Sequence, residues 1–263
     1  MPDLTTLNAV KAWLNVSSNQ DDQLLSGLIS QVSAVILSYL GRGDILKRQY
    51  LEPFTGIGQA SKPLRNYPVL SVASVSTGRL AVPAGDGVGI GYWVDPDEGF
   101  PPGRMQLVHL NGFRFERTLC KIVYEAGYAI SGEQQTAATT IIALAPNGSW
   151  ARDDGVTYAN GTPLTPVATN PSVGQYAMNP RIPGQYIFST ADAGAQVLLN
   201  YSYIPDVLEQ ACIETVAERY RYKNRIGQVS ESANGMTTST FSLKDMQDYV
   251  KLSLQPFRRV VPV

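Results

Sequence analysis

The sequence predicts an α+β fold: a small bundle of about four main helices, a small antiparallel β region and an inserted all-β module. Apolar residues recur at helical spacing near both ends of the chain. Short β-branched and aromatic runs, separated by Gly and Pro, fill residues 50–128. Residues 129–204 carry very little charge and are rich in Thr, Ala, Gly, Asn and Pro. That composition favours a light β module, because an unstructured loop of such length is uncommon.

Two helices are expected at the N-terminus. Leu7, Val10 and Leu14 share one helical face in residues 3–14, and Thr5 or Thr6 is available as the N-cap. A second helix begins near Asp21 and Asp22, where negative charge favours a helix N-terminus, and ends at Gly41. Its apolar face is formed by Leu25, Leu28, Val32, Ile36 and Tyr39.

Strands are expected in two regions. In the first, residues 69–77, 106–110 and 120–124 have β-branched or aromatic patterns. Asn111-Gly112 predicts a two-residue hairpin between residues 106–110 and 113–115, because both residues accept positive φ. In the second region, residues 139–144, 186–189 and 197–203 are expected as strands, with turns at Asn147-Gly148 and Asn160-Gly161.

Helical patterns return near the C-terminus. Asp206 and Glu209 form a capping-box pattern before a helix that is expected to reach about Tyr222. Residues 227–240 form a polar Ser, Thr, Asn and Gly stretch. Ser242 with Asp245 then predicts the cap of a last helix, whose apolar positions are Met246, Val250 and Leu254 and which Pro256 ends.

Composition argues against several classes of protein. A chain of 263 residues with 44% hydrophobic and 16% charged residues is expected to be globular. Its net charge of -1 gives no global positive field for nucleic acid. Cys120 and Cys212 are expected as buried thiols, without a disulfide framework or metal cluster. No apolar run reaches the roughly 20 residues of a membrane span, and the N-terminus has no secretory signal pattern.

No catalytic, cofactor or metal site is predicted. The single histidine, His109, lies in an expected strand with no nucleophile near it in sequence, so a structural role is favoured. Four glycines in residues 85–91 do not satisfy the dinucleotide-binding pattern. Asp95, Asp97 and Glu98 are interpreted as a solvated turn, because Gly99 occupies the place of a third calcium ligand.

The C-terminal segment is the first candidate for an interaction. From Arg219 onward there are eight basic and three acidic residues. A solvated helix face explains this charge as well as an interface does. The basic set consists of Arg219, Arg221, Lys223 and Arg225. Residues 256–263 combine an aromatic, two arginines and a β-capable end, which suits docking as an extended strand, with a frayed terminus as the alternative.

Taken in order, these patterns resemble the head-tail connector (adaptor) proteins of tailed bacteriophages. The resemblance rests on several segments of the chain. They are LTTLNAVKAWL at 4–14, DD at 21–22, SYLGR at 38–42, YPVLSV at 67–72, YEAGY at 124–128, LEQA at 208–211, AERY at 217–220 and FRR at 257–259. It covers residues 1–128 and 204–263, an adaptor core, and leaves 129–203 as an inserted β module ending in a second YSY strand end.

The resemblance implies a structural virion protein at the head-tail junction, without catalysis or cofactor. Such proteins form a ring, commonly of twelve copies, that docks on the portal protein, receives the stopper or tail, and lies near packaged DNA without specific recognition. Assembly would take place in the host cytoplasm, away from any membrane. The portal-binding residues it implies are Phe257, Arg258, Arg259, Val260, Val261, Pro262 and Val263.

Two other classes remain as alternatives. A phage cell-wall hydrolase would need a cluster of His, Asp, Glu or Cys, and one histidine with two dispersed cysteines does not supply it. A virion decoration or tail-fibre module would use the β insert as its functional part and would not need a basic helical end.

Overall fold

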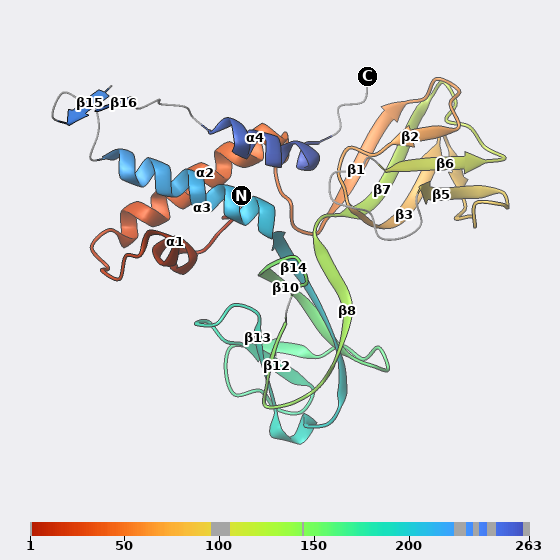
Figure 1. Ribbon diagram of the computed structural model, residues 1–263. Coiled ribbons are helices and arrows are strands. Elements are labelled where there is room, and N and C mark those ends of the chain that lie inside the picture. Colours follow the sequence, from red (N-terminus) through yellow and green to blue (C-terminus); the bar gives the residue numbers. More distant parts are fainter. Residues whose placement is uncertain are drawn as a thin grey trace. The chain divides into compact units, whose positions relative to one another are not determined.

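The computed structural model describes residues 2–95, 106–143, 145–223, 230–233, 237–240 and 246–259 (Figure 1). The chain divides into two compact units. One unit is helical and consists of Met1–Gly43 and Asp206–Arg258. The other consists mainly of Asp44–Pro205 and is built from strands.

The helical unit contains α1 (Leu7–Leu14), α2 (Asp22–Leu40), α3 (Asp206–Tyr222), α4 (Asp248–Leu254) and the short 3-10 helix η3 (Gln255–Phe257). Strands β15 (Ser230–Ala233) and β16 (Thr237–Thr240) pair as an antiparallel hairpin. Thr6 caps α1 by accepting a hydrogen bond from the amide of Ala9, as predicted, and Gly41 ends α2 with φ of 67°. Glu209 is bonded to the hydroxyl of Thr5.

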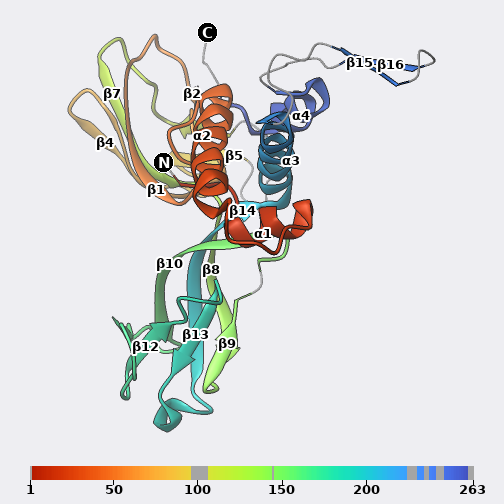
Figure 2. The same cartoon turned by 90° about the vertical axis from the view of Figure 1, so that its left-hand side faces the viewer.

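Helices α2 and α3 pack side by side (Figure 2). Their apolar faces are buried, with Leu25, Val32 and Ile36 on α2 and Leu208 and Val216 on α3 fully inaccessible. Between these faces the hydroxyl of Ser33 accepts the amide of Leu4 at 2.9 Å and lies 3.6 Å from Sγ of Cys212. Burial raises the pKa of the Cys212 thiol to about 12.

Helix α2 is long and apolar enough to cross a membrane, judged by length and composition alone, with a mean hydropathy of 1.5. This differs from the sequence expectation that no segment reaches a span. Of the apolar 18-residue stretch of α2 that has this hydropathy, 39% is buried. Helices in protein cores reach the same length and hydropathy.

In the β unit, residues 48–126 form two antiparallel sheets. The first has the order β1 (Arg48–Thr55), β7 (Leu119–Ala126), β3 (Val69–Thr77), β4 (Leu80–Val82). The second has the order β2 (Ser61–Pro63), β6 (Leu107–Asn111), β5 (Gly91–Asp95). Alternate residues of these strands face a shared core that includes Val75, Val108, Phe115, Ile122 and Tyr124.

Residues 129–205 form two further sheets with their own core. One has the order β10 (Gly148–Tyr158), β14 (Gln196–Pro205), β8 (Ala129–Thr136). The other has the order β11 (Thr165–Val167), β12 (Gln175–Met178), β13 (Gln185–Phe188), β9 (Thr140–Ile142), and the 3-10 turn η1 (Thr190–Asp192) precedes β14. Tyr176, Tyr186, Phe188, Val197, Leu199 and Tyr201 are the large buried side chains of this core.

The fold class predicted from the sequence is wrong, because the protein is mostly β. Of the described residues, 40% lie in strands and 26% in helices. The sequence pattern undercounted strands for two physical reasons. Several strands have only three to five residues, too short for an alternation to stand out. In β10 the run Arg152-Asp153-Asp154 looks like a loop, yet bulges break the alternation there and each charge has a partner within the strands.

The predicted hairpin between residues 106–110 and 113–115, with its turn at Asn111-Gly112, is also wrong. Gly112 does have positive φ, at 74°. However, β6 pairs with β2 and β5, and Phe115 bridges to Gln59. The turn chemistry was correct, but it redirects the chain away from β6.

The YEAGY segment has a packing reason for its glycine. Gly127 has φ of 137°, and a Cβ there would lie 2.4 Å from the carbonyl group of Leu46. The amide of Tyr128 donates to Ile45, and the amide of Tyr203 donates to Tyr128 at 3.0 Å. The two ends of segment 129–203 are therefore adjacent, because Ser202 also pairs with Ala129.

Candidate functional site

The described members of the predicted basic set, Arg219, Arg221 and Lys223, lie at the C-terminal end of α3, near the start of α2. Tyr220 donates its hydroxyl proton to Oδ2 of Asp21, and Nζ of Lys223 lies 3.0 Å from the same oxygen. Lys223 also lies 4.1 Å from the ring centroid of Tyr220. Helices α2 and α3 are thus antiparallel, and a carboxylate at one N-terminus meets a cation at the other C-terminus.

These contacts change the electrostatics of the pair. The hydrogen bond from Tyr220 and then that from Lys223 hold the pKa of Asp21 below its ordinary value of 3.8. The hydrogen bond to Asp21 raises the pKa of Lys223. Both side chains are therefore charged at neutral pH, and Lys223 contributes to the fold of its own chain.

The other members of the basic set differ in their surroundings. Arg219 is partly buried within α3, whereas Arg221 is exposed and makes no ion pair with any residue that the structure describes. Arg225 lies outside the described residues. Among Arg219, Arg221 and Lys223, which the structure describes, Arg221 is the exposed side chain and is available to a partner.

The predicted portal-binding residues begin in η3. Phe257 is buried, with only 4% of its surface exposed. The guanidinium of Arg258 lies over the ring of Tyr39 at 5.2 Å from its centroid, and the hydroxyl of Tyr39 donates to the carbonyl of Lys251 at 3.3 Å. Arg259 is partly exposed. Val260, Val261, Pro262 and Val263 lie outside the described residues.

The structure separates these two candidate surfaces. Lys223 contacts Asp21 before the first turn of α2, and Arg258 contacts Tyr39 in its last turn. Eighteen helical steps at about 1.5 Å each place these contacts about 27 Å apart along α2. The described residues Lys223 and Arg258 therefore contact opposite ends of α2, within the helical unit.

Sequence reasoning missed the partners that bind these residues within the helical unit. The sequence pattern marks Asp21 only as a helix-start residue and Tyr39 only as a position on the apolar face of its helix. The signal that could have found the first pair is a carboxylate at the N-terminus of one predicted helix and a lysine at the C-terminus of another. Tyr39 carried no such signal, since its ring lies under Arg258 through tertiary packing of α4.

The remaining predicted residues have structural surroundings. His109 stacks on Trp93 with ring centroids 5.1 Å apart, and its Nε2 lies 3.5 Å from Oδ2 of Asp95. Asp97, Glu98 and Gly99 lie outside the described residues. Across the part of the chain that the structure describes, no group of three or more His, Cys, Asp or Glu is placed to hold a metal ion. Cys120 and Cys212 are free and buried, as predicted.

Residues 4–68 match the family model described as phage gp6-like head-tail connector protein. The matched segment includes α1, α2, β1 and β2, so it extends from the helical unit into the β unit. The match confirms the predicted resemblance for this segment and supports a head-tail connector protein. This class is a structural, non-enzymatic component of the bacteriophage particle at its head-tail junction, associated with portal and tail components. A search of the curated proteins found no match.

Proposed function

We propose that this protein is a head-tail adaptor whose copies form a ring, of twelve in the usual arrangement, between the portal and the stopper or tail. The match over residues 4–68 carries this proposal. A closed ring suits the task, because each copy needs only a light contact when all copies bind at once. The protein would assemble in the host cytoplasm, serve DNA passage in the virion and catalyse no reaction.

We propose that Arg258, Arg259 and residues 260–263 dock on the portal. The two arginines would pair with carboxylates, and the β-capable end would add a strand to a portal edge. Phe257 belongs to the predicted portal-binding set as its apolar anchor. Because its side chain is buried, we propose that it fixes the start of the tail on its own helical unit. Deleting residues 256–263 would therefore remove a buried side chain as well as the tail.

A pull-down on purified portal protein tests this docking. The variant R258E/R259E and a chain lacking residues 260–263 should both fold and lose portal binding. The matched control is R181E, an exposed arginine on the loop between β12 and β13. Equal retention of all three variants would overturn the assignment of the portal contact to the C-terminal segment.

We propose that the basic end of α3 faces the portal or the DNA channel through Arg221. Its attraction should weaken with salt, because screening shortens to about 8 Å near physiological ionic strength. R221Q should reduce assembly on the portal and the yield of particles, whereas K223Q should act mainly on the contact with Asp21. Unchanged assembly of R221Q would show that Arg221 is a solvated charge without a role in the contact.

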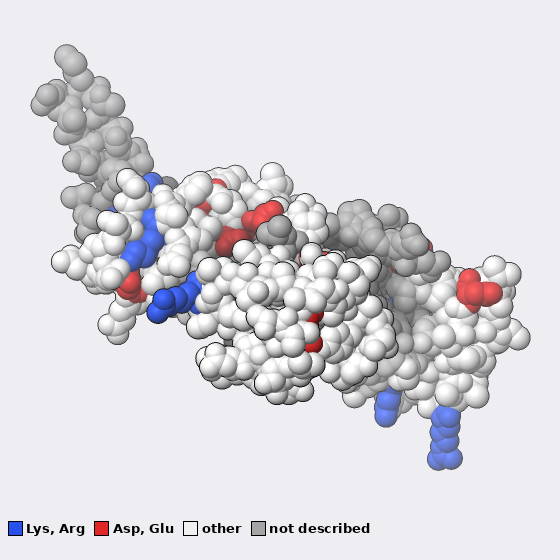
Figure 3. Space-filling model, turned by 90° about the horizontal axis from the view of Figure 1, so that it is seen from below, with Lys and Arg blue, Asp and Glu red and all other residues white. Residues whose placement is uncertain are grey.

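We propose that residues 129–203 are a β module inserted into an adaptor core of residues 1–128 and 204–263. Two observations support this division. Every strand pair that the structure describes within residues 129–205 joins two strands of that same segment, and the module's ends meet at Tyr128 and Tyr203. The face seen from below is mostly uncharged (Figure 3). Residues 129–203 carry two arginines against four carboxylates, a net charge of -2, so the module suits contact with capsid, stopper or tail proteins more than with DNA.

A further inference from the structure

A loop of the β unit presents two aliphatic side chains to solvent. Val88 is 87% exposed and Ile90 is 69% exposed, between β4 and β5. The loop has fixed internal bonds. Oδ1 of Asp86 accepts the amides of Val88 at 3.0 Å and Gly89 at 2.6 Å, and Nδ2 of Asn111 donates to the carbonyls of the same two residues. We call residues 85–91 the acidic knob.

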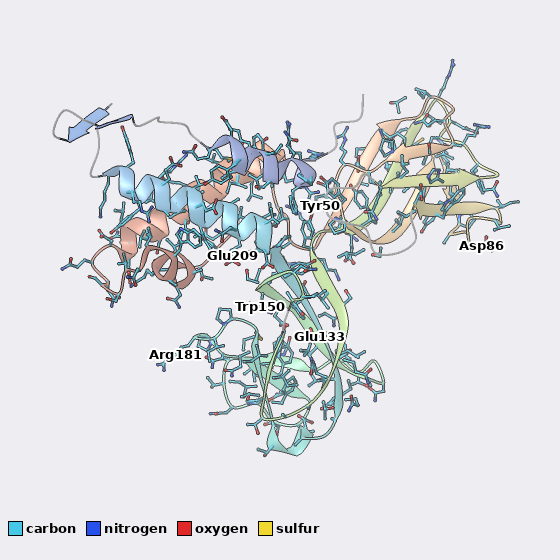
Figure 4. All side chains as sticks on the ribbon, viewed as in Figure 1. Tyr50, Asp86, Glu133, Trp150, Arg181 and Glu209 are labelled. Carbon is cyan, nitrogen blue, oxygen red and sulfur yellow. The ribbon has the colours of Figure 1, made fainter. Side chains whose placement is uncertain are left out.

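The charge of the knob is fixed by the same bonds. The amides of Gly89 and then Val88 hold the pKa of Asp86 below its ordinary value of 3.8, so this side chain is an anion at neutral pH. Both hydrogen bonds end on Oδ1, which leaves Oδ2 as an acceptor for a cation. Asp86 lies at the outer edge of this part of the β unit (Figure 4).

A pocket of about 850 Å³ opens on the same β unit. Leu80, Leu110 and Phe113 give it apolar lining, and Arg114 and Arg117 line it as well. Both arginines are exposed, and neither makes an ion pair among the described residues. We call these five residues the arginine pocket.

The lining carries one opposing charge, because Glu116 also contributes to the arginine pocket. Two arginines against one glutamate leave it net positive. Arg114 donates to the carbonyl of Gly58 at 3.4 Å, a long bond that a carboxylate would displace at little cost.

We propose that the acidic knob of one copy docks in the arginine pocket of the next copy. The two surfaces are complementary in both respects that decide a contact: aliphatic side chains meet an apolar wall, and an anion meets two arginines. Knob and pocket adjoin on one chain, because Asn111, which bonds the knob, also lines the pocket. A reciprocal contact would stop at a dimer, whereas the head-to-tail contact proposed here leaves a knob or a pocket open at each end and continues from copy to copy until it closes. For its closure into a ring, the inference rests on the proposed function.

The same chemistry argues against nucleic acid as the occupant. Arginines alone would attract phosphates, but a phosphate backbone would leave Leu80 and Phe113 uncovered and give no role to Val88 and Ile90. A protein surface with both an aliphatic pair and a carboxylate uses every part of the pocket, and the knob of this chain has that composition.

Mass photometry of the full chain tests the proposal with two variants, the knob variant V88S/I90S and the pocket variant R114E/R117E. Each variant changes exposed side chains, so folding should be unaffected, which circular dichroism checks. Wild-type protein should form assemblies larger than a dimer, and each variant alone should be monomeric. Mixed together, they should form a particle of twice the monomer mass, because each keeps the half that the other lacks.

The controls are V173S and R181E, an exposed valine and an exposed arginine in the 129–203 module. Both should assemble like the wild type, and wild-type assembly should weaken as salt screens the contact between Asp86 and the arginines. Three results would overturn the proposal: a monomeric wild type, assembly that survives in both variants, or a pocket variant that loses only binding to duplex DNA. A portal pull-down of the same samples separates failure of this proposal from failure of the connector function. If the wild type binds the portal and both variants assemble like the wild type, the connector function stands and the knob contact is rejected.

Discussion

Nζ of Lys223 lies 3.0 Å from Oδ2 of Asp21, although 202 residues separate them in the chain. Tyr220 donates to the same carboxylate. This contact joins the end of α3 to the start of α2 and closes one end of the helical unit. The matched connector segment contains Asp21, whereas Tyr220 and Lys223 lie outside it. The segment therefore depends on the C-terminal helices for its own packing.

Asp21 should make the helical unit sensitive to acid. Because the folded-state pKa of Asp21 is lowered from 3.8, its stabilisation is present above that value and is lost as pH falls through the lowered pKa. The melting temperature of the wild type should therefore approach that of D21N on acidification. NMR titration of Y220F and K223Q should show the pKa of Asp21 rising toward 3.8. An unchanged pKa in both variants would mean that these contacts do not form.

Asp153 should stabilise the 129–203 module. Its carboxylate accepts the hydroxyls of Tyr176 at 2.6 Å and Tyr186 at 3.0 Å, and both tyrosines are buried. D153A would leave two buried hydroxyls without a charged acceptor, at a cost of about 1–3 kcal/mol. Urea unfolding in a W13F/W93F background, in which Trp150 beside Tyr186 is the remaining tryptophan, measures it by fluorescence. R181A should change stability by less than about 0.5 kcal/mol.

Phe257 should be a core residue of the helical unit. It is 4% exposed, whereas Leu252 on the preceding helix is 65% exposed. F257A should destabilise the protein by about 3–5 kcal/mol, the usual loss for removing a buried phenyl group. L252A is the matched control and should stay within about 0.5 kcal/mol of the wild type. Similar melting curves for both variants would contradict the packing of η3.

The 129–203 module should be removable. Replacing residues 129–203 by a short Gly-Ser bridge should leave a soluble protein that still forms rings, because Tyr128 and Tyr203 are already hydrogen-bonded neighbours. Doubling the bridge length should change stability by only about 0.6 kcal/mol. Light scattering and electron microscopy of the excised chain check this. An insoluble product would count against an independent module, and a normal ring with a functional defect would indicate that the module contacts another virion protein.

The helices of the N-terminal region and α3 could be predicted closely from the sequence. Leu7, Val10 and Leu14 mark α1, Thr6 caps it, and Gly41 ends α2. Such signals are local, because a helix repeats within a few residues and its caps lie beside it. The resemblance to head-tail connectors depended on the same segments, and the match begins there.

The sheets and the surfaces could not be predicted to the same extent. Strand β10 contains Arg152, Asp153 and Asp154, whose partners lie on strands distant in sequence, so only the fold shows why they are tolerated. The knob and the pocket were missed for a similar reason. Val88 and Ile90 lie in a glycine-rich stretch whose pattern gives no sign of exposed aliphatic side chains. Arg114 and Arg117 indicate a binding surface only once the fold places them beside Leu80 and Phe113.

Electron microscopy of the purified protein mixed with the portal protein of its phage tests the connector function most directly. The account predicts closed rings with a central hole, each stacked coaxially on a portal, and loss of the stacking in R258E/R259E. Protein that stays monomeric and separate from the portal, or that binds along the capsid surface instead, would contradict it.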